Sequence, residues 1–210
     1  MQIALPIIGV FAVSFFLGSI PWGLVISKLF FHKDLRTVGS GNIGTTNAIR
    51  AMGKVGGYAV FVLDFGKGLL SGFIGLWVSE ACGFDTHLQQ IALAVAFAGC
   101  IWGHIFSPWL KFKGGKGIAV GVGCLFVAMG PVIALMELAL FTILVIATRY
   151  VSVGSIAAGA TCPLFALWAY WGNPVAWFFA AAAGLTIVWA HRANIARLRA
   201  GTESRVGKKK

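Results

Sequence analysis

The sequence predicts an all-α, polytopic integral membrane protein, and three observations support this fold class. Hydrophobic residues make up 59% of the chain, and the mean hydropathy is +0.87. Charged residues make up only 11%, whereas soluble domains carry about 25%. Most of the charges also fall in short segments between long apolar runs. We expect one domain over 1–210, in which 198–210 form a basic tail.

Seven apolar runs are candidates for spanning helices, each of which needs about 20 residues. The run 118–147 is too long for one span, and Gly130-Pro131 divides it because these residues interrupt helices. The first part of that run is short and reaches only part of the way across a bilayer. The predicted helices are 3–27, 55–79, 88–106, 118–129, 131–147, 151–171 and 174–190.

Basic residues predict the orientation of these helices. All but one of the 17 lysines and arginines fall in 28–54, 107–117, Arg149 and the segment 191–210. The intervening segments near 80–87, 130 and 172–174 hold none. Because positively charged loops stay in the cytoplasm, seven crossings place the N-terminus outside and the C-terminus inside. With six or eight crossings, the basic segments would no longer all lie on one side of the membrane.

Three polar segments interrupt the apolar sequence, and all fall on the predicted cytoplasmic side. Closely spaced glycines allow successive N–H groups to form a concave anion site. The first two segments lead into predicted helices, whose N-termini carry free N–H groups and partial positive charge. We therefore expect the segments to surround a phosphate. They are Gly39-Ser-Gly-Asn-Ile-Gly-Thr-Thr-Asn47, Phe112-Lys-Gly-Gly-Lys-Gly117 and His191-Arg-Ala-Asn-Ile-Ala-Arg-Leu198.

Side chains in and beside these segments suit a phosphate. Arg50 and Lys116 add full positive charges. Taken alone, Lys116 would equally suit a lysine that snorkels to the interface, but the flanking glycines favour a ligand. His191 and Asn194 are three apart and share a helix face. Histidine can act as a base or donate to phosphate, and an interfacial histidine at a helix end is the structural alternative.

Four ionisable residues fall within predicted helices, where such groups are functional candidates. Asp64 and Lys67 are three apart and are expected to pair, which favours a structural role, although Asp64 could also face the site. His104 is expected to brace the second polar segment. Glu137 has no evident local partner, and the sequence assigns it no role.

Nucleotide and metal sites are not expected. Gly39-x-Gly-x-x-Gly44 matches the dinucleotide fingerprint, and the same loop resembles a P-loop with Thr45 in place of the lysine. Both motifs require a preceding β-strand, whereas a predicted membrane helix precedes Gly39 in this chain. The four cysteines lack zinc-site spacing. The net charge of +11 lies in loops and does not indicate nucleic acid. We expect no metal and no cofactor.

Longer stretches resemble the PlsY family of bacterial membrane acyltransferases, which use acyl phosphate and glycerol 3-phosphate. Similar to its first motif are Gly18-Ser-Ile-Pro-Trp-Gly23, Asp34-Leu-Arg36 and the first polar segment. Gly103-His104 and 112–119 resemble the second motif, and 191–203 resembles the third. Leu63-Asp-Phe-Gly-Lys-Gly68 and Arg149-Tyr-Val-Ser152 are also similar to family segments. Thr45 and Val120 depart from the usual alanine and threonine.

The resemblance implies a seven-helix fold in the cell membrane with its site on the cytoplasmic face. It implies that the 1-hydroxyl of glycerol 3-phosphate attacks acyl phosphate, giving 1-acylglycerol 3-phosphate and inorganic phosphate, the first acylation of phospholipid synthesis. The implied catalytic residues are His191, Asn194 and Lys116. The implied substrate-binding residues are Gly39, Ser40, Gly41, Asn42, Gly44, Thr46, Asn47, Arg50, Gly114, Gly115, Gly117, Arg149 and Ser152.

Acyl phosphate is an activated anhydride, so positioning and charge stabilisation could suffice for catalysis. No nucleophile with an activating base and no His-x-x-x-x-Asp pair is evident. We expect direct attack, with the first loop and Arg50 on one phosphate and Lys116 with the second loop on the other. Which loop holds which phosphate is open, as is the base, either His191 or a phosphate oxygen. The acyl chain is expected between helices, against membrane lipid.

Two other functions fit some of these features. A transporter or channel for a small anion would use Asp64, Lys67 and Glu137, but transporter sites usually lie at the midplane between repeats, and no repeat is visible. A basic scaffold for anionic lipids would explain Lys208–Lys210 but not the glycines.

Overall fold

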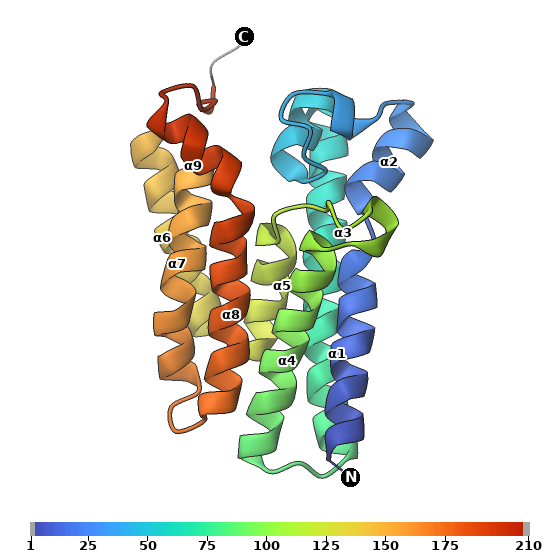
Figure 1. Ribbon diagram of the computed structural model, residues 1–210, viewed down its shortest axis with the longest axis vertical. Coiled ribbons are helices and arrows are strands. Elements are labelled where there is room, and N and C mark those ends of the chain that lie inside the picture. Colours follow the sequence, from blue (N-terminus) through green and yellow to red (C-terminus); the bar gives the residue numbers. More distant parts are fainter. Residues whose placement is uncertain (1–2, 208–210) are drawn as a thin grey trace.

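The protein, seen here as a computed structural model that describes residues 3–207, is all-α, as predicted from its sequence (Figure 1). Most helices run along the long axis of the molecule, with α6, α7 and α8 in one half and α1 to α5 in the other. The predicted tail residues 208–210 lie outside the described range. The helices are α1 (Ala4–Ser19), α2 (Trp22–Phe31), α3 (Thr45–Ala81), α4 (Thr86–Ile105), α5 (Ile118–Ala128), α6 (Pro131–Thr148), α7 (Val151–Ala169), α8 (Pro174–Ala190) and α9 (Arg192–Arg199), with short 3-10 turns at Leu35–Thr37 and Pro108–Leu110.

Several helices are suited to a bilayer. Five segments of the described chain are long and apolar enough to cross a membrane, and six if α8 and α9, which meet at 48°, form one span. The predicted short fourth helix exists as α5, whose 11 residues cover about 16 Å at the helical rise, roughly half of a ~30 Å hydrocarbon core. The five segments are Ala4–Phe31, Thr45–Ala81, Thr86–Leu110, Pro131–Thr148 and Val151–Ala169.

The first predicted helix is broken at Ile20 into α1 and α2, because Pro21 has no N–H to continue the helical ladder. Carbonyl groups freed near the break find partners on other elements. Lys67 Nζ donates to the Ile20 carbonyl at 2.7 Å, and Ser107 Oγ donates to the Ser19 carbonyl at 2.7 Å. Backbone groups within a membrane need such internal partners.

The helix α3 begins at Thr45, well before the predicted start at residue 55. Hydropathy missed its first turns because they are polar and basic. Gly53, with φ 75° and ψ −173°, bends the chain between these turns and the spanning part of α3. Lys33 Nζ donates to the Ala51 carbonyl at 2.7 Å next to this bend. Thr46, Asn47 and Arg50, which were predicted on a loop, are therefore helical residues.

Small residues let the helices pack closely, as predicted for this class. A Cβ at Gly103 of α4 would overlap the Phe15 carbonyl of α1, and one at Gly68 of α3 would overlap the Val120 carbonyl of α5. One cluster of buried apolar side chains draws on α1, α4, α5, α6, α7 and α8. The two halves of the bundle therefore share this core, and a second, smaller cluster lies around α2, the start of α3 and Leu35.

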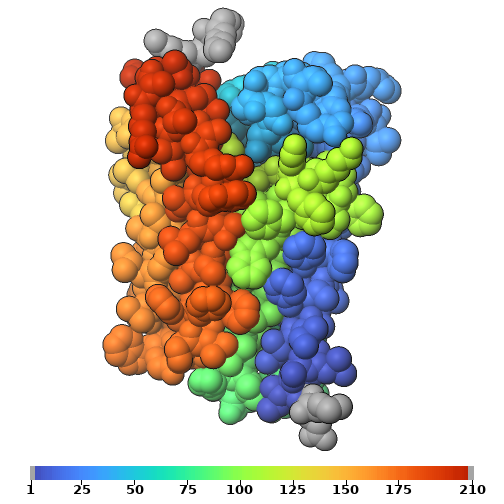
Figure 2. Space-filling view, viewed as in Figure 1, coloured from blue at the N-terminus to red at the C-terminus, as the bar shows by residue number. Residues whose placement is uncertain are grey.

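The polar segments gather at one end of the bundle. Figure 1 shows the 32–44 region, the loop between α4 and α5, and α9 at the same end. Figure 2 shows the C-terminal residues and the 32–44 region as two lobes at that end, with an indentation between them. Most of the positive charge of the chain is thereby concentrated over the opening of the site.

Candidate active site

The first polar loop is shaped by Asn47, whose side chain is buried. Its Nδ2 group lies 3.0, 2.9 and 2.9 Å from the carbonyl oxygens of Leu35, Val38 and Asn42, and its Oδ1 accepts from Ser40 N–H at 3.0 Å. Asn47 was expected to bind substrate. It lines the cavity, and its amide is bonded within the loop, so it also acts as a tether.

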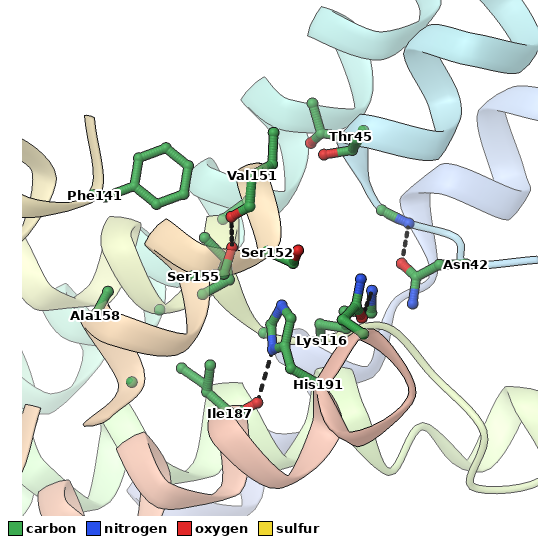
Figure 3. Close-up of a pocket in the computed structure, with 18 of the residues that line it drawn as sticks. Asn42, Thr45, Lys116, Phe141, Val151, Ser152, Ser155, Ala158, Ile187 and His191 are labelled. Carbon is green, nitrogen blue, oxygen red and sulfur yellow. Dashed lines mark hydrogen bonds between the residues drawn. The ribbon is translucent and has the colours of Figure 1, made fainter. Parts of the chain in front are cut away.

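The glycines of this loop are required by its backbone. Gly39 and Gly41 adopt left-handed φ values of 58° and 70°, and a Cβ on Gly39 would meet Oδ1 of Asn47. Gly41 does not line the cavity, and its contact with substrate stays a prediction. Gly44 N–H is also occupied, because it donates to Asn42 Oδ1 at 2.8 Å (Figure 3).

The start of α3 supplies further free donors beside the loop. The N–H groups of Thr45 and Thr46 stand in the first helical turn, where no earlier helical carbonyl can accept them. The Thr45 hydroxyl is buried and makes no hydrogen bond among the described residues. Arg50 is exposed and lines the same cavity, so this end presents N–H groups, a hydroxyl and a cation.

The second loop uses its glycines for packing. Gly114 N–H donates to the Ile105 carbonyl at 2.9 Å, and Gly115 N–H donates to the His104 carbonyl at 3.0 Å. A Cβ on Gly114 would overlap the His104 carbonyl, and one on Gly115 would overlap the His104 ring. These two residues therefore do not form the expected anion nest. The prediction that His104 braces this loop is confirmed.

Beyond these glycines the loop delivers Lys116 to the cavity. Gly117 takes a left-handed φ of 86° as α5 begins, and both residues line the cavity. Lys116 Nζ donates to Asn194 Oδ1 of α9. Burial lowers the pKa of Lys116 to about 8, helped by the positive charges of Arg197 and Arg50 and opposed by Glu203. Lys116 is thus a half-buried cation that loses its charge more readily than a solvated lysine.

Asn194 is the centre of a polar chain that links the second loop to the tail. Its Nδ2 donates to Glu203 Oε1 at 2.7 Å, and Arg197 Nε donates to Glu203 Oε2 at 2.6 Å. Burial acts to raise the pKa of Glu203, but these hydrogen bonds outweigh it and hold that pKa below its usual value. Arg197 and Glu203 were missed as site residues, although Glu203 is the one acidic residue in the sequence 192–210.

His191 stands at the bend between α8 and α9 and is buried. Its Nδ1 lies 2.8 Å from the Ile187 carbonyl, so in the neutral ring the proton belongs on Nδ1. The other ring nitrogen points toward Ser152 across the cavity (Figure 3). His191 therefore presents an acceptor nitrogen to any ligand bound there.

The turn between α6 and α7 completes the polar end. The Ser152 hydroxyl is buried, lines the cavity and makes no hydrogen bond among the described residues. Arg149 does not line the cavity. Its carbonyl accepts from Val206 N–H at 2.8 Å and so anchors the tail, and its contact with substrate stays a prediction. Arg205, another missed residue, lines the cavity and donates from Nε to the Tyr150 hydroxyl at 2.9 Å.

These groups open into one cavity of about 1470 Å³ with two chemically distinct parts. The polar part is formed by the residues described above. The other part is apolar and extends between the helices. Its wall is formed chiefly by Phe61, Phe65, Phe97, Leu125, Phe126, Leu138, Phe141, Cys162 and Ile187. The cavity suits an amphiphile with an anionic head and a long apolar tail.

Proteins with similar sequences are named glycerol-3-phosphate acyltransferases. A family model described as glycerol-3-phosphate acyltransferase matches residues 8–201. The glycerol-3-phosphate acyltransferase of Rhodopseudomonas palustris (strain BisB5) is 39% identical over 203 residues, covering 97% of each chain.

Two solved structures have the same fold. Both are crystal structures of PlsY, an integral membrane glycerol 3-phosphate acyltransferase. The glycerol 3-phosphate form is 38% identical with a TM-score of 0.83 and covers 96% of both chains. The lysophosphatidic acid form is 36% identical with a TM-score of 0.80, and covers 96% of this chain and 95% of the other. The chain therefore belongs to the glycerol-3-phosphate acyltransferase family of integral membrane enzymes.

Proposed function

We propose that this protein transfers a fatty acyl group from acyl phosphate to the 1-hydroxyl of glycerol 3-phosphate. The products are lysophosphatidate and inorganic phosphate, and the reaction is the first acylation of phospholipid synthesis. The observation that carries the proposal is the single cavity that joins a cationic, N–H-rich end to an apolar space between helices. An acyl phosphate has this shape and polarity.

The polar end offers separate groups for two phosphates. The start of α3, with Ser40, Thr46 and Arg50, forms one group, and Lys116 with Gly117 forms the other. Both sets line the same cavity, so the attacking hydroxyl and the acyl carbon can be held side by side. Positive charge on Lys116 stabilises the leaving phosphate as the bond to the acyl carbon breaks.

His191 is proposed as the base. Its Nδ1 is held by the Ile187 carbonyl, so the opposite nitrogen is free to accept the proton of the glycerol hydroxyl. Asn194 orients this region through its bonds to Lys116 and Glu203. His191→Ala is expected to lower turnover by about 10²–10⁴-fold. Near-normal turnover with an unchanged pH profile would mean that a substrate phosphate oxygen takes the proton instead.

The proposed topology has seven crossings in the cytoplasmic membrane, with the N-terminus outside and the active site in the cytoplasm. The start of α1 and the end of α9 lie at opposite ends of the bundle, which an odd number of crossings requires (Figure 1). Basic residues cluster at the cavity end, in agreement with the positive-inside rule. The proposal counts α5 and α8 as crossings in addition to the five long segments.

The test is phosphate release from acyl phosphate by the full chain in detergent, with and without glycerol 3-phosphate. We expect release only when glycerol 3-phosphate is present, together with an equal amount of lysophosphatidate. Release that does not depend on the acceptor would contradict the proposal. Membership of an acyltransferase family disfavours the anion transporter, and liposomes that take up phosphate without acyl transfer would restore it.

A further inference from the structure

Glu137 is a buried acid that the proposed chemistry does not use. It lies on α6 with only 4% of its surface exposed, and it lines the cavity in the apolar part. At the helical rise of ~1.5 Å per residue, it stands about 16 Å from the end of α6 nearest the polar groups. Phe141, one turn away on the same helix face, also lines the cavity (Figure 3). A carboxyl group at this depth faces the acyl part of the cavity.

The hydrogen bonds of Glu137 are incomplete. Thr161 Oγ1 of α7 lies 3.2 Å from each carboxyl oxygen and 2.9 Å from the Ala157 carbonyl. The Ala158 carbonyl lies 3.3 Å from the same hydroxyl, and a hydroxyl has one hydrogen, so it serves only one of these four acceptors. If Glu137 is protonated and donates to Thr161, its other oxygen still accepts nothing. In either protonation state, at least one carboxyl oxygen lacks a donor among the described residues.

We propose that Glu137, which Thr161 of α7 contacts from outside the cavity lining, forms a polar subsite that recognises a hydroxyl group on the distal part of the acyl chain. This inference rests on the proposed function, because it concerns the acyl substrate of the same cavity. A ligand hydroxyl would donate to the unfilled carboxyl oxygen. An unsubstituted chain leaves that oxygen buried without a partner, and sites built to bind a hydroxyl discriminate against ligands that lack it.

A purely structural link between α6 and α7 is the competing explanation. The two helices are already held by a short turn at 149–150 and by the close approach of Gly154 to the Phe141 carbonyl. A structural link would change stability or overall rate, and it would act equally on all acyl chains. The ratio of kcat/KM for two acyl chains of equal length therefore separates the two explanations.

The experiment uses the full chain in detergent with three acyl phosphates of equal length. One is unsubstituted, one carries a hydroxyl in the distal half of the chain, and one carries a hydroxyl next to the carbonyl. We expect the wild type to prefer the distal hydroxyl over the unsubstituted chain by about tenfold in kcat/KM. The hydroxyl next to the carbonyl should give no preference, because it cannot reach Glu137.

Variants test the assignment to Glu137. Glu137→Leu should abolish the preference, whereas Glu137→Gln should keep most of it because the amide oxygen still accepts. Thr161→Val should raise the preference above the wild-type value, since the ligand hydroxyl then becomes the partner of the carboxyl. Met136→Leu is the matched control, because Met136 is exposed on the same helix and does not line the cavity, and it should leave the ratio unchanged.

A wild-type ratio near one, or the same ratio in wild type and Glu137→Leu, would overturn the proposal in favour of a structural link. If Glu137→Leu does not fold, the wild-type ratio and the opposite change in Thr161→Val decide the matter. If the wild type consumes none of the three acyl phosphates, the proposed function itself fails and the subsite falls with it. If the wild type turns over the unsubstituted and hydroxylated acyl phosphates equally well, the subsite proposal is refuted and the proposed function stands.

Discussion

The two glycine-rich loops have similar composition, and the backbone uses them in opposite ways. In the first loop, Gly39 and Gly41 adopt left-handed φ values that turn the chain into the start of α3. In the second, Gly114 and Gly115 have no positive φ, and each makes room for His104. The first loop thus exposes the N-terminus of a helix, whereas the second positions one lysine.

Glycine can therefore contribute to an anion site indirectly, through packing that positions a charged side chain. A glycine nest offers N–H groups to a ligand. In the second loop the N–H groups of Gly114 and Gly115 are already bonded to carbonyls of α4, so Lys116 and Gly117, and not these two glycines, face the ligand. The first loop should therefore be sensitive to changes of its backbone, and the second to changes of packing and charge.

The largest effect is expected when the positive charge of Lys116 is removed from the second loop. Lys116→Ala should lower kcat/KM by about 10²–10³-fold, the usual cost of removing one group that stabilises a developing charge. Lys113→Ala is the matched control, because Lys113 is exposed in the same loop and does not line the cavity. The measurement is phosphate release at saturating glycerol 3-phosphate. Equal losses in both variants would indicate a general effect of surface charge.

Packing of the second loop gives the next effect. Gly115→Ala should lower stability by about 1–3 kcal/mol, because the added Cβ overlaps a His104 ring that Lys67 Nζ holds at 3.0 Å from Nδ1. The thermal midpoint in detergent should fall by roughly 2–4 °C per kcal/mol. Gly66→Ala on α3 is the control, since a Cβ there meets nothing within 4 Å. An unchanged midpoint for Gly115→Ala would refute the packing role.

A smaller effect follows from the pKa of Lys116, which burial lowers to about 8. The charged form predominates below that pH and is lost above it, so kcat/KM should fall by up to about tenfold per unit above pH 8. Arg50 and Arg197 act on Lys116 through their positive charges, and Glu203, whose pKa is held below its usual value, stays ionised over this range. Lys116→Arg should remove the decline, because guanidinium does not titrate in this range. A flat profile in the wild type would show that this charge is not needed.

Sequence reasoning was most successful where local spacing decides the structure. The spacing of Asp64 and Lys67 predicted their ion pair, which forms at 2.8 Å. Gly130-Pro131 correctly separated α5 from α6. Hydropathy failed at Thr45, because polar first turns of a helix resemble a loop when only apolar content is counted.

The candidate site was harder to predict because its contacts join distant segments. Lys116 reaches Asn194 across 78 positions, and His104 approaches Gly115 only in the folded chain. Glu203 was missed because it lies in a basic tail that resembles a solvated run. Its isolation among positive charges was the available signal, since a single acid in such a run tends to be paired.

The smallest expected effect concerns Arg149, which the family resemblance suggested as a substrate ligand. Its carbonyl holds Val206 of the tail, and its side chain does not line the cavity. Arg149→Ala keeps the carbonyl, so kcat/KM should stay within about twofold of wild type, as for most surface changes.

Arg50→Ala, in which the lost cation does line the cavity, should raise the KM for one of the two phosphates by about tenfold. Measured with both substrates varied, that rise would also identify the phosphate that the first loop holds. A loss in Arg149→Ala as large as that in Arg50→Ala would mean that the tail and its anchor move in catalysis to bring Arg149 to the substrate.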